Sequence, residues 1–438
     1  MLKKKLANTS GANATGNKRA ALFEIDGDRR YARSEAHSSR FIKVTVVAPP
    51  AGKQSDRPAV RIGFVLDRSG SMQGEKIQNA RKAIIEGIKM LSARDEYAVV
   101  TFDNEIETVI PLTGAKRGAT EAESLIRNIE ARGNTNLCDG YLTGAQEVGG
   151  ERSGEVVQRV ILVSDGHANT GVTDALTLGQ HASQLRTRGV STATLGIGDG
   201  FDETLMSAIA TSGGGPAQYA AQPSQIEQAI AACIGEALEV TLRDAEVVLR
   251  LPGADFTLLT SGDAHLVRGE LRIALGDLGA NQERDVVARV RLPRGSNGSD
   301  VQLSAELSGR SEDGDVRLKQ SYTWTYADSD TNDGQERNRP LDRVVAGLYA
   351  ANAREQAMVI NREGDYERAA KLLNRVADRI AGYAGSDREL KELVRKLRNE
   401  AEVVARPQTE KFRKEQHYLA RNLMESRSAD FTQRKRSR

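Results

Sequence analysis

The chain has few cysteines and lacks any long apolar run. Among its 438 residues only Cys138 and Cys233 are cysteines, which is too few for a disulfide framework and typical of a reducing compartment. No run of about 18 apolar residues occurs, so no transmembrane helix is predicted. Residues 1–16 contain lysines but no following apolar segment, so they lack the form of a secretory signal. These absences together predict a cytoplasmic protein.

The chain also lacks a strong excess of charge of either sign. Its 62 Lys and Arg residues nearly balance its 60 Asp and Glu residues, which argues against a surface built as a whole to hold nucleic acid or an anionic membrane. Residues 1–20 carry five basic and no acidic side chains, and residues 406–438 carry ten basic and four acidic ones. We expect residues 1–20 to be a disordered basic tail and residues 406–438 to be a second basic tail, in which residues 417–424 form a short helix. Binding of nucleic acid or anionic lipid through these tails is the alternative to plain solvated ends.

Aromatic residues are sparse, at 4%, but 39% hydrophobic residues is enough for globular domains. A chain of this length should divide into two or three domains. Residues 58–239 alternate strand-like and helix-like segments, which predicts an α/β domain with a doubly wound, mainly parallel, Rossmann-like sheet. Residues 340–405 contain three segments with helical patterns and predict a C-terminal α-helical hairpin region.

Two further segments have strand-like patterns. In residues 240–326, apolar and polar residues alternate between glycine turns, which predicts an antiparallel β-sandwich. Residues 21–50 also have strand patterns, and Asp26–Asp28 has the composition of a hairpin turn. Because residues 21–50 alone are too few to bury a face, we expect these strands to pair with the sandwich. The α/β domain would then be inserted in the sandwich rather than simply followed by it.

The most informative stretch is Arg61–Met72. Its apolar run, Ile62–Leu66, is typical of a buried central strand. The run ends at Asp67, and Ser69 and Ser71 follow at alternate positions. In open α/β sheets, ligands bind at the edge formed by the carboxyl ends of the strands. One carboxylate and two hydroxyls at this edge predict a site for a hard cation such as Mg²⁺.

This segment also carries a family resemblance. Asp67–Ser71 resembles the Asp-x-Ser-x-Ser element of the von Willebrand factor type A (VWA) domain, whose members bind a metal at a metal-ion-dependent adhesion site (MIDAS). Gly133–Leu137 is similar to the family's threonine loop, with Thr135 as the ligand. Val163–Gly166 is similar to the strand that ends in the last aspartate, Asp165. The three segments occur in the family's order, so residues 58–239 are identified as a VWA domain with a complete MIDAS.

The resemblance implies a role for each of five residues. Ser69 and Ser71 would ligate the metal directly. Asp67 and Asp165 would supply charge, partly through water, and Thr135 would become a direct ligand when a partner is bound. The cation would be Mg²⁺, with Mn²⁺ or Ca²⁺ as alternatives. A dication held by these groups stays under-neutralised, and in the family it therefore takes an Asp or Glu side chain from a protein partner.

Two other interpretations compete with this one. Asp and Ser after strands commonly cap turns and helices, although independent turns would not reproduce three spaced motifs. A strand that ends in Asp also occurs in haloacid-dehalogenase-like phosphatases, so a Mg²⁺-dependent phosphatase-like enzyme is the alternative function. Those enzymes use a second Asp two residues later, where this chain has Ser69, which cannot act as an acid or base near neutral pH. The chain has no GxSxG motif either, and we predict a binding module and not an enzyme.

Features beside the motifs allow further predictions. Arg68 either projects outward to pair with an acidic partner or is a solvated loop residue. His167 should lie on the rim of the site, since an oxygen-rich site does not need imidazole. The closing helix, residues 224–238, leads directly into the β segment. It therefore either only covers the sheet or transmits metal-dependent binding to the sandwich.

These expectations combine into one functional prediction. The protein should be a cytoplasmic adaptor or scaffold of bacterial type, whose metal site binds an acidic residue of a protein partner. Relatives of the VWA domain often work beside AAA+ ATPases, or beside paired kinases and phosphatases in stress and defence systems. The sequence does not choose between these partners.

Overall fold

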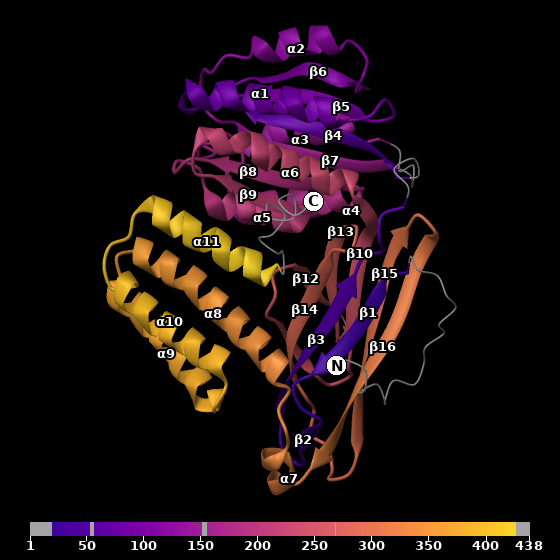
Figure 1. Cartoon of the computed structure of the whole chain (residues 1–438), viewed down its shortest axis with the longest axis vertical. Coiled ribbons are helices and arrows are strands. Elements are labelled where there is room, and N and C mark those ends of the chain that lie inside the picture. The colour runs from indigo at the N-terminus through magenta and orange to yellow at the C-terminus, as the bar shows by residue number, and fades with distance from the viewer. Residues whose placement is uncertain (1–19, 53–56, 151–155, 268, 426–438) are drawn as a thin grey trace.

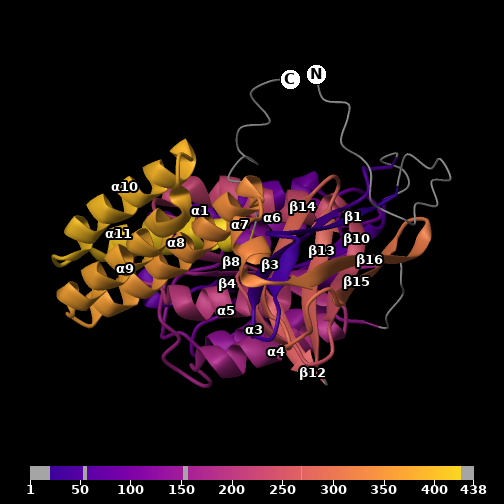
Figure 2. The same ribbon diagram turned by 90° about the horizontal axis from the view of Figure 1, so that it is seen from below.

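The computed structural model describes residues 20–425 apart from 53–56, 151–155 and 268. Residues 1–19 of the first predicted tail and residues 426–438 of the second therefore lie outside the described residues. The described chain forms an α/β domain, a β-sandwich and a helical lobe (Figure 1). Seen from below, the helices of the lobe lie on one side of the molecule and the outer strands of the sandwich on the other (Figure 2). The predicted fold class is confirmed.

The α/β domain is built on a six-stranded sheet in the order β6-β5-β4-β7-β8-β9. All neighbouring strands are parallel except β6, which runs antiparallel to β5 at the edge. The central strand β4 is buried over nearly its whole length, as its apolar run predicts. The strands are β4 (Ala59–Asp67), β5 (Glu96–Phe102), β6 (Ile106–Gly114), β7 (Val156–Ser164), β8 (Val190–Ile197) and β9 (Gly214–Ala220).

Helices cover both faces of this sheet. One core cluster joins the sheet to α1 (Glu75–Met90), α2 (Ala119–Arg127) and α6 (Ile226–Leu238). The other joins it to α3 (Leu137–Val148), α4 (Ala175–Thr187) and α5 (Glu203–Gly213). Helix α3 lies so close to β4 that a Cβ atom at Gly144 would be only 2.1 Å from Cγ2 of Val65. This close approach holds the start of α3, and the loop before it, at the carboxyl end of β4.

The β-sandwich consists of a four-stranded and a six-stranded sheet. The first has the order β1-β3-β14-β11 and the second β12-β13-β10-β15-β16-β2. Strand β3 pairs antiparallel with β14, so that Val44 lies opposite Val286, and the α/β domain is inserted between β3 and β10. The strands are β1 (Leu22–Gly27), β2 (Tyr31–Arg33), β3 (Ser39–Val47), β10 (Val240–Arg250), β11 (Asp255–Leu258), β12 (Asp263–Val267), β13 (Glu270–Gly279), β14 (Glu283–Arg291), β15 (Asp300–Ser311) and β16 (Gly314–Ala327).

The predicted hairpin turn at Asp26–Asp28 is wrong. Strand β1 pairs with β3 in one sheet, while β2 pairs in parallel with β16 in the other. The carboxylate of Asp28 is buried and accepts a hydrogen bond of 2.8 Å from the backbone N–H of Phe41. The segment therefore crosses from one sheet to the other instead of reversing within one of them.

The helical lobe follows the sandwich. Its helices are α7 (Ser329–Gly334), α8 (Arg339–Arg362), α9 (Tyr366–Ala384), α10 (Arg388–Val404) and α11 (Glu410–Met424). Helices α8, α9 and α10 share a core of alanine and larger aliphatic side chains, and α11 lies along α8 beside α5 (Figure 1). The prediction of a basic tail is corrected for residues 410–424, because they form α11, which is longer than the short helix expected over residues 417–424 and buries Lys414, Tyr418 and Met424.

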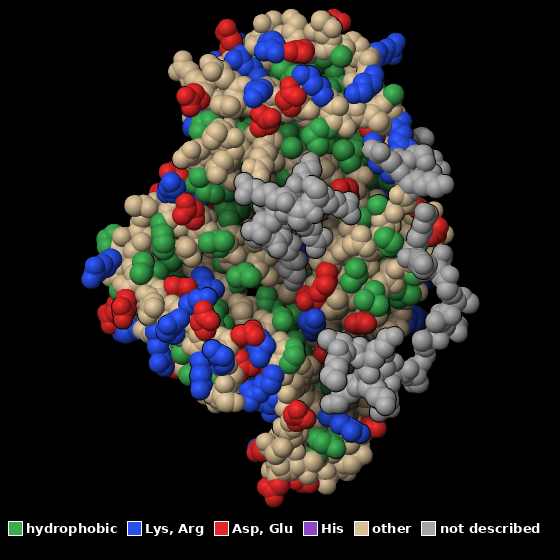
Figure 3. All heavy atoms as spheres, in the orientation of Figure 1, with side chains coloured by type: hydrophobic (Ala, Val, Ile, Leu, Met, Phe, Trp, Pro, Cys, Tyr) green, Lys and Arg blue, Asp and Glu red, His purple; other side chains and the backbone are tan. Residues whose placement is uncertain are grey.

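The surface carries both signs of charge. Figure 3 shows Lys and Arg side chains interspersed with Asp and Glu side chains on the face that it presents, over the α/β domain and the helical lobe alike. Within the described residues, none of the helices is both long and apolar enough to cross a bilayer.

Candidate metal site

Loops that are far apart in the sequence meet at the carboxyl end of the central sheet. Asp67 ends β4, and Asp165 directly follows β7, which pairs in parallel with β4. The hydroxyl of Ser71 donates a 2.6 Å hydrogen bond to Oδ1 of Asp165. The Oγ atoms of Ser69 and Ser71 lie 3.0 Å apart, and the backbone N–H of Ser69 donates to Oδ1 of Asp67 at 2.8 Å. Four of the five predicted site residues thus form one connected group of oxygen atoms.

The fifth residue, Thr135, faces the same space. A Cβ atom placed on Gly166 would lie 3.4 Å from Oγ1 of Thr135, 3.5 Å from Oγ of Ser71 and 4.0 Å from Oδ2 of Asp67. Oxygen atoms from three separate loops therefore surround one point beside Gly166. A methyl group at this position would occupy part of the space between these oxygen atoms.

The threonine loop is positioned by a two-way contact with the loop that follows β7. The side-chain oxygen of Asn169 accepts from the backbone N–H of Thr135 at 3.0 Å, and the backbone N–H of Asn169 donates to the carbonyl of Thr135 at 3.2 Å. The backbone N–H of Gly70 also donates to the carbonyl of Gly133 at 3.0 Å. These bonds tie the threonine loop to both neighbouring loops, so the three loops act as one unit.

Asp67 is fully buried at the base of the group. The hydroxyl of Ser164 donates to its Oδ2 at 2.5 Å. Burial raises the pKa of Asp67 to about 6, although the hydrogen bonds from Ser164 and Ser69 favour the charged form and oppose this rise. A bound dication would, like these hydrogen bonds, favour the ionised form of the Asp67 carboxylate.

The donor set suits a hard dication. It offers two carboxylates and three hydroxyls, and oxygen donors of this kind are the ligands of Mg²⁺ and Ca²⁺. Across residues 20–425, outside the gaps in the description, no group of three or more His, Cys, Asp or Glu side chains is placed to hold a metal. The candidate metal site therefore combines hydroxyl groups with carboxylates. Its oxygen donors fit the Mg²⁺ ion that the sequence predicts.

Arg68, which lies between the predicted ligands, does not project outward. It is 6% exposed, its Nε lies 3.2 Å from Oδ2 of Asp103, and its Nη1 donates to Glu107 at 2.5 Å. The guanidinium turns toward β5 and β6 because these carboxylates neutralise it there. Arg68 therefore stabilises the loop instead of meeting a partner. His167 is exposed, in keeping with a rim position.

Lys76 is the residue of the site that sequence reasoning missed. It lies in the first turn of α1, and its Nζ donates to Oδ2 of Asp165 and, at 3.2 Å, to the carbonyl of Ser71. The Asp165 side chain is 0% exposed and that of Lys76 31% exposed. The signal in the sequence is position alone: α1 begins at the site, so a basic residue in its first turn lies over the oxygen group.

The α/β domain is similar to a known protein family. Residues 62–232 match the model of the von Willebrand factor type A domain. Protein sll0103 of Synechocystis sp. is 29% identical over 273 residues, which cover 58% of this chain and 62% of that protein. This chain therefore spans less than two thirds of the length of that relative.

Two solved structures resemble most of the chain. A von Willebrand factor type A protein from Catenulispora acidiphila has a TM-score of 0.71 at 18% identity, covering 88% of this chain and 91% of that one. The ArnB paralog VWA2 from Sulfolobus acidocaldarius has a TM-score of 0.61 at 16% identity, covering 93% and 98%. At these identities the likeness concerns the fold, and it extends beyond the α/β domain to the sandwich and the helical lobe.

Proposed function

We propose that this protein, whose residues 62–232 form a von Willebrand factor type A domain, is a metal-dependent protein-binding module. Its site binds Mg²⁺, with Mn²⁺ or Ca²⁺ as substitutes, and the bound metal takes an Asp or Glu side chain from a protein partner. The observation that carries the proposal is the set of oxygens from three loops around one point beside Gly166.

Each of the five residues has a part in this proposal. Ser69 and Ser71 present hydroxyl oxygens 3.0 Å apart and bind the metal directly. Asp67, which accepts hydrogen bonds from Ser164 and from the backbone of Ser69, supplies negative charge at the buried base of the site. Asp165 supplies the second charge and orients Ser71. Thr135 completes the set when a partner carboxylate arrives.

We propose a binding and not a catalytic role. Asp67 is 0% exposed, so it does not present a nucleophilic carboxylate to a substrate. The position two residues later is Ser69, whose hydroxyl cannot serve as the acid that a phosphatase of this kind needs. Binding of a partner's carboxylate needs neither group, because the metal supplies the attraction.

The rest of the molecule suits a scaffold. The sandwich and the helical lobe hold the α/β domain on two sides, and the charged surface is mixed in sign (Figures 1 and 3). This surface favours a protein partner over nucleic acid. We place the protein in a cytoplasmic assembly, beside an AAA+ ATPase or a kinase and phosphatase pair.

Calorimetry tests the metal site. Titration with Mg²⁺ and Mn²⁺ should show one site in the wild type and none in Asp67→Ala. The matched control is Asp255→Ala, which removes a carboxylate that is 78% exposed in the sandwich. Equal metal binding by the wild type and Asp67→Ala would end the proposal.

Capture of protein partners with and without a chelator then tests whether partner binding depends on the metal. The proposal expects a partner that the chelator releases.

A further inference from the structure

We propose that Lys76 sets the charge of the metal site so that a bound dication needs a third carboxylate, which the protein partner supplies. This inference rests on the proposed function and goes beyond it, because it names a residue that determines what the site accepts. It starts from the direct contact between the Lys76 ammonium group and Asp165.

The contact divides the oxygens of Asp165 between two tasks. Oδ1 accepts from Ser71 and faces the oxygen group, while Oδ2 accepts from Lys76 on the other side. The Lys76 ammonium also donates to the carbonyl of Ser71. Its stem passes the loop after β8, where a Cβ atom at Gly198 would lie 3.8 Å from Cε of Lys76. The ammonium group is thus held beside the oxygens by two hydrogen bonds.

The formal charges of the site follow from these contacts. Asp67 and Asp165 bring two negative charges and Lys76 brings one positive charge. The nearby guanidinium of Arg68 does not enter the count, because Asp103 and Glu107 neutralise it. A dication added to this set leaves one positive charge, and one carboxylate from outside neutralises it. Without Lys76 the dication alone would balance the two aspartates, and an incoming carboxylate would leave an excess of negative charge.

Two opposite effects follow when the ammonium group is removed. Lys76→Met keeps the apolar stem and removes the charge, so the metal should bind more tightly, since a like charge next to it is gone. The same variant should bind a free carboxylate more weakly at the metal. We expect about a tenfold change in each constant, the order of effect of one partly exposed charge a few ångströms away. A purely structural lysine that only fastened α1 to the loops would not shift the two constants in opposite directions.

Mn²⁺ and acetate are the probes for this test. Calorimetry with Mn²⁺ measures the metal constant, and water-proton relaxation of the Mn²⁺-loaded protein during an acetate titration measures carboxylate binding. Lys76→Arg keeps the charge and should retain wild-type behaviour in both measurements. Lys82→Met is the matched control, because Lys82 lies on the same helix with a side chain 65% exposed and pairs with Glu227. Circular dichroism confirms that each variant is folded.

The inference predicts tighter Mn²⁺ binding and weaker acetate binding for Lys76→Met, with Lys76→Arg and Lys82→Met unchanged. It is overturned if Lys76→Met leaves both constants unchanged or shifts both in the same direction. Failure of the proposed function would give a different result. The wild type and Asp67→Ala would then bind Mn²⁺ with equal affinity, whatever residue stands at position 76.

Discussion

Two buried carboxylates of the α/β domain, Asp165 and Glu203, are each paired with a lysine, the first within the domain and the second from the helical lobe. At the metal-loop edge, which we define as the loops that contain Ser69, Thr135 and Asp165, Lys76 contacts Asp165 after β7, and 31% of the lysine side chain is exposed. At the joint, which we define as the contact of α11 with α5 and β9, Lys414 contacts Glu203 at 2.7 Å and only 2% of its side chain is exposed. The same pair of chemical groups therefore stands in two surroundings, one open to solvent and one closed.

At the joint, further contacts shield the Lys414–Glu203 pair from solvent. Lys414 also donates to the carbonyl of Phe201 at 2.5 Å, and the ring of Tyr418 stacks on that of Tyr219 with centroids 5.4 Å apart. Burial would raise the pKa of Glu203, but the hydrogen bond and charge of Lys414, together with Arg362, lower it to about 2. At the metal-loop edge, by contrast, hydroxyl oxygens remain beside the pair. We therefore interpret the Lys414 pair as a structural clamp and the Lys76 pair as part of the proposed metal site.

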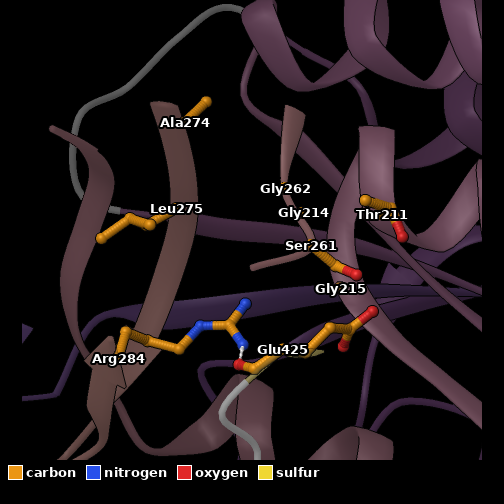
Figure 4. Close-up of a pocket in the computed structure, with 9 residues that line it drawn as sticks. All are labelled: Thr211, Gly214, Gly215, Ser261, Gly262, Ala274, Leu275, Arg284 and Glu425. Atoms are coloured by element: carbon orange, nitrogen blue, oxygen red, sulfur yellow. Dashed lines mark hydrogen bonds between the residues drawn. The ribbon is translucent and has the colours of Figure 1, made fainter. Parts of the chain in front are cut away.

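A small cavity lies next to the joint, between α5, β9 and the sandwich. Figure 4 shows Arg284 of β14 extending toward the backbone of Glu425, just after α11, where it donates to the carbonyl. The cavity beside them has a volume of about 20 Å³, which is room for roughly one water molecule. This pocket marks where the α/β domain, the sandwich and α11 meet.

The largest expected effect comes from breaking the closed pair. Glu203→Ala leaves the Lys414 ammonium group buried without its carboxylate, and we expect a loss of about 3–5 kcal/mol in the free energy of unfolding. Urea denaturation followed by circular dichroism measures this loss. Glu227→Ala is the matched control: it removes the exposed partner of Lys82 and should cost about 0–1 kcal/mol. Similar losses for the two variants would show that the joint is not a clamp.

The second prediction uses acid to loosen the same joint. His417 of α11 lies 3.0 Å from the hydroxyl of Ser207, and burial, with the charge of Arg421 next, lowers its pKa to about 4. Between pH 6.5 and 4 the unfolded chain binds a proton that the folded chain does not, so the free energy of unfolding falls as the pH falls. The loss should reach about 3 kcal/mol below this window.

Denaturation at a series of pH values checks this prediction. The neutral variant His417→Gln is the comparison, since it lacks the titrating group while other groups of the joint, including Glu355 and Arg421, stay in place. The wild type should lose more stability than the variant between pH 6.5 and 4. Parallel curves for the two proteins would contradict the assignment of this window to His417.

The third and smallest prediction concerns the open edge. Gly166→Ala places a methyl group within 3.5 Å of the Thr135 and Ser71 hydroxyls. Metal affinity should fall about tenfold, equivalent to about 1.4 kcal/mol, while the free energy of unfolding changes by less than about 1 kcal/mol, because the space lies at the surface end of the loops. Calorimetry with Mn²⁺ and urea denaturation give the two values. Unchanged metal affinity would mean that the metal does not occupy this space.

The contrast between the two regions also explains what could be predicted from the sequence. The metal-loop edge follows buried strands, so the short motifs around Asp67 and Asp165 indicate both the strands and the oxygens at their ends. The inner face of α11 contains Lys414, His417 and Tyr418, whose packing depends on ion pairs and ring stacking. Because these contacts are not aliphatic, the sequence alone predicts only a short helix over residues 417–424 and assigns the rest of the segment to a basic tail.

The pairing of β1 and β2 and the contact of Lys76 with Asp165 could not be predicted from the sequence, for different reasons. Alternating residues show which side chains of residues 21–50 face a core, but not that β1 and β2 belong to different sheets. Lys76 reaches Asp165 across 89 positions of the chain, a contact that no local pattern contains. The hypothesis that α6 transmits binding to the sandwich stays a prediction: α6 packs closely on α1, where a Cβ atom at Gly87 would lie 2.6 Å from Cδ1 of Ile234.

A crystal of the full chain grown with Mn²⁺ tests the central claim most directly. The account predicts an anomalous-scattering peak beside Gly166, at coordination distance, about 2.1 Å, from the hydroxyl oxygens of Ser69 and Ser71. A peak at any other place in the molecule, with none between these loops, would contradict it.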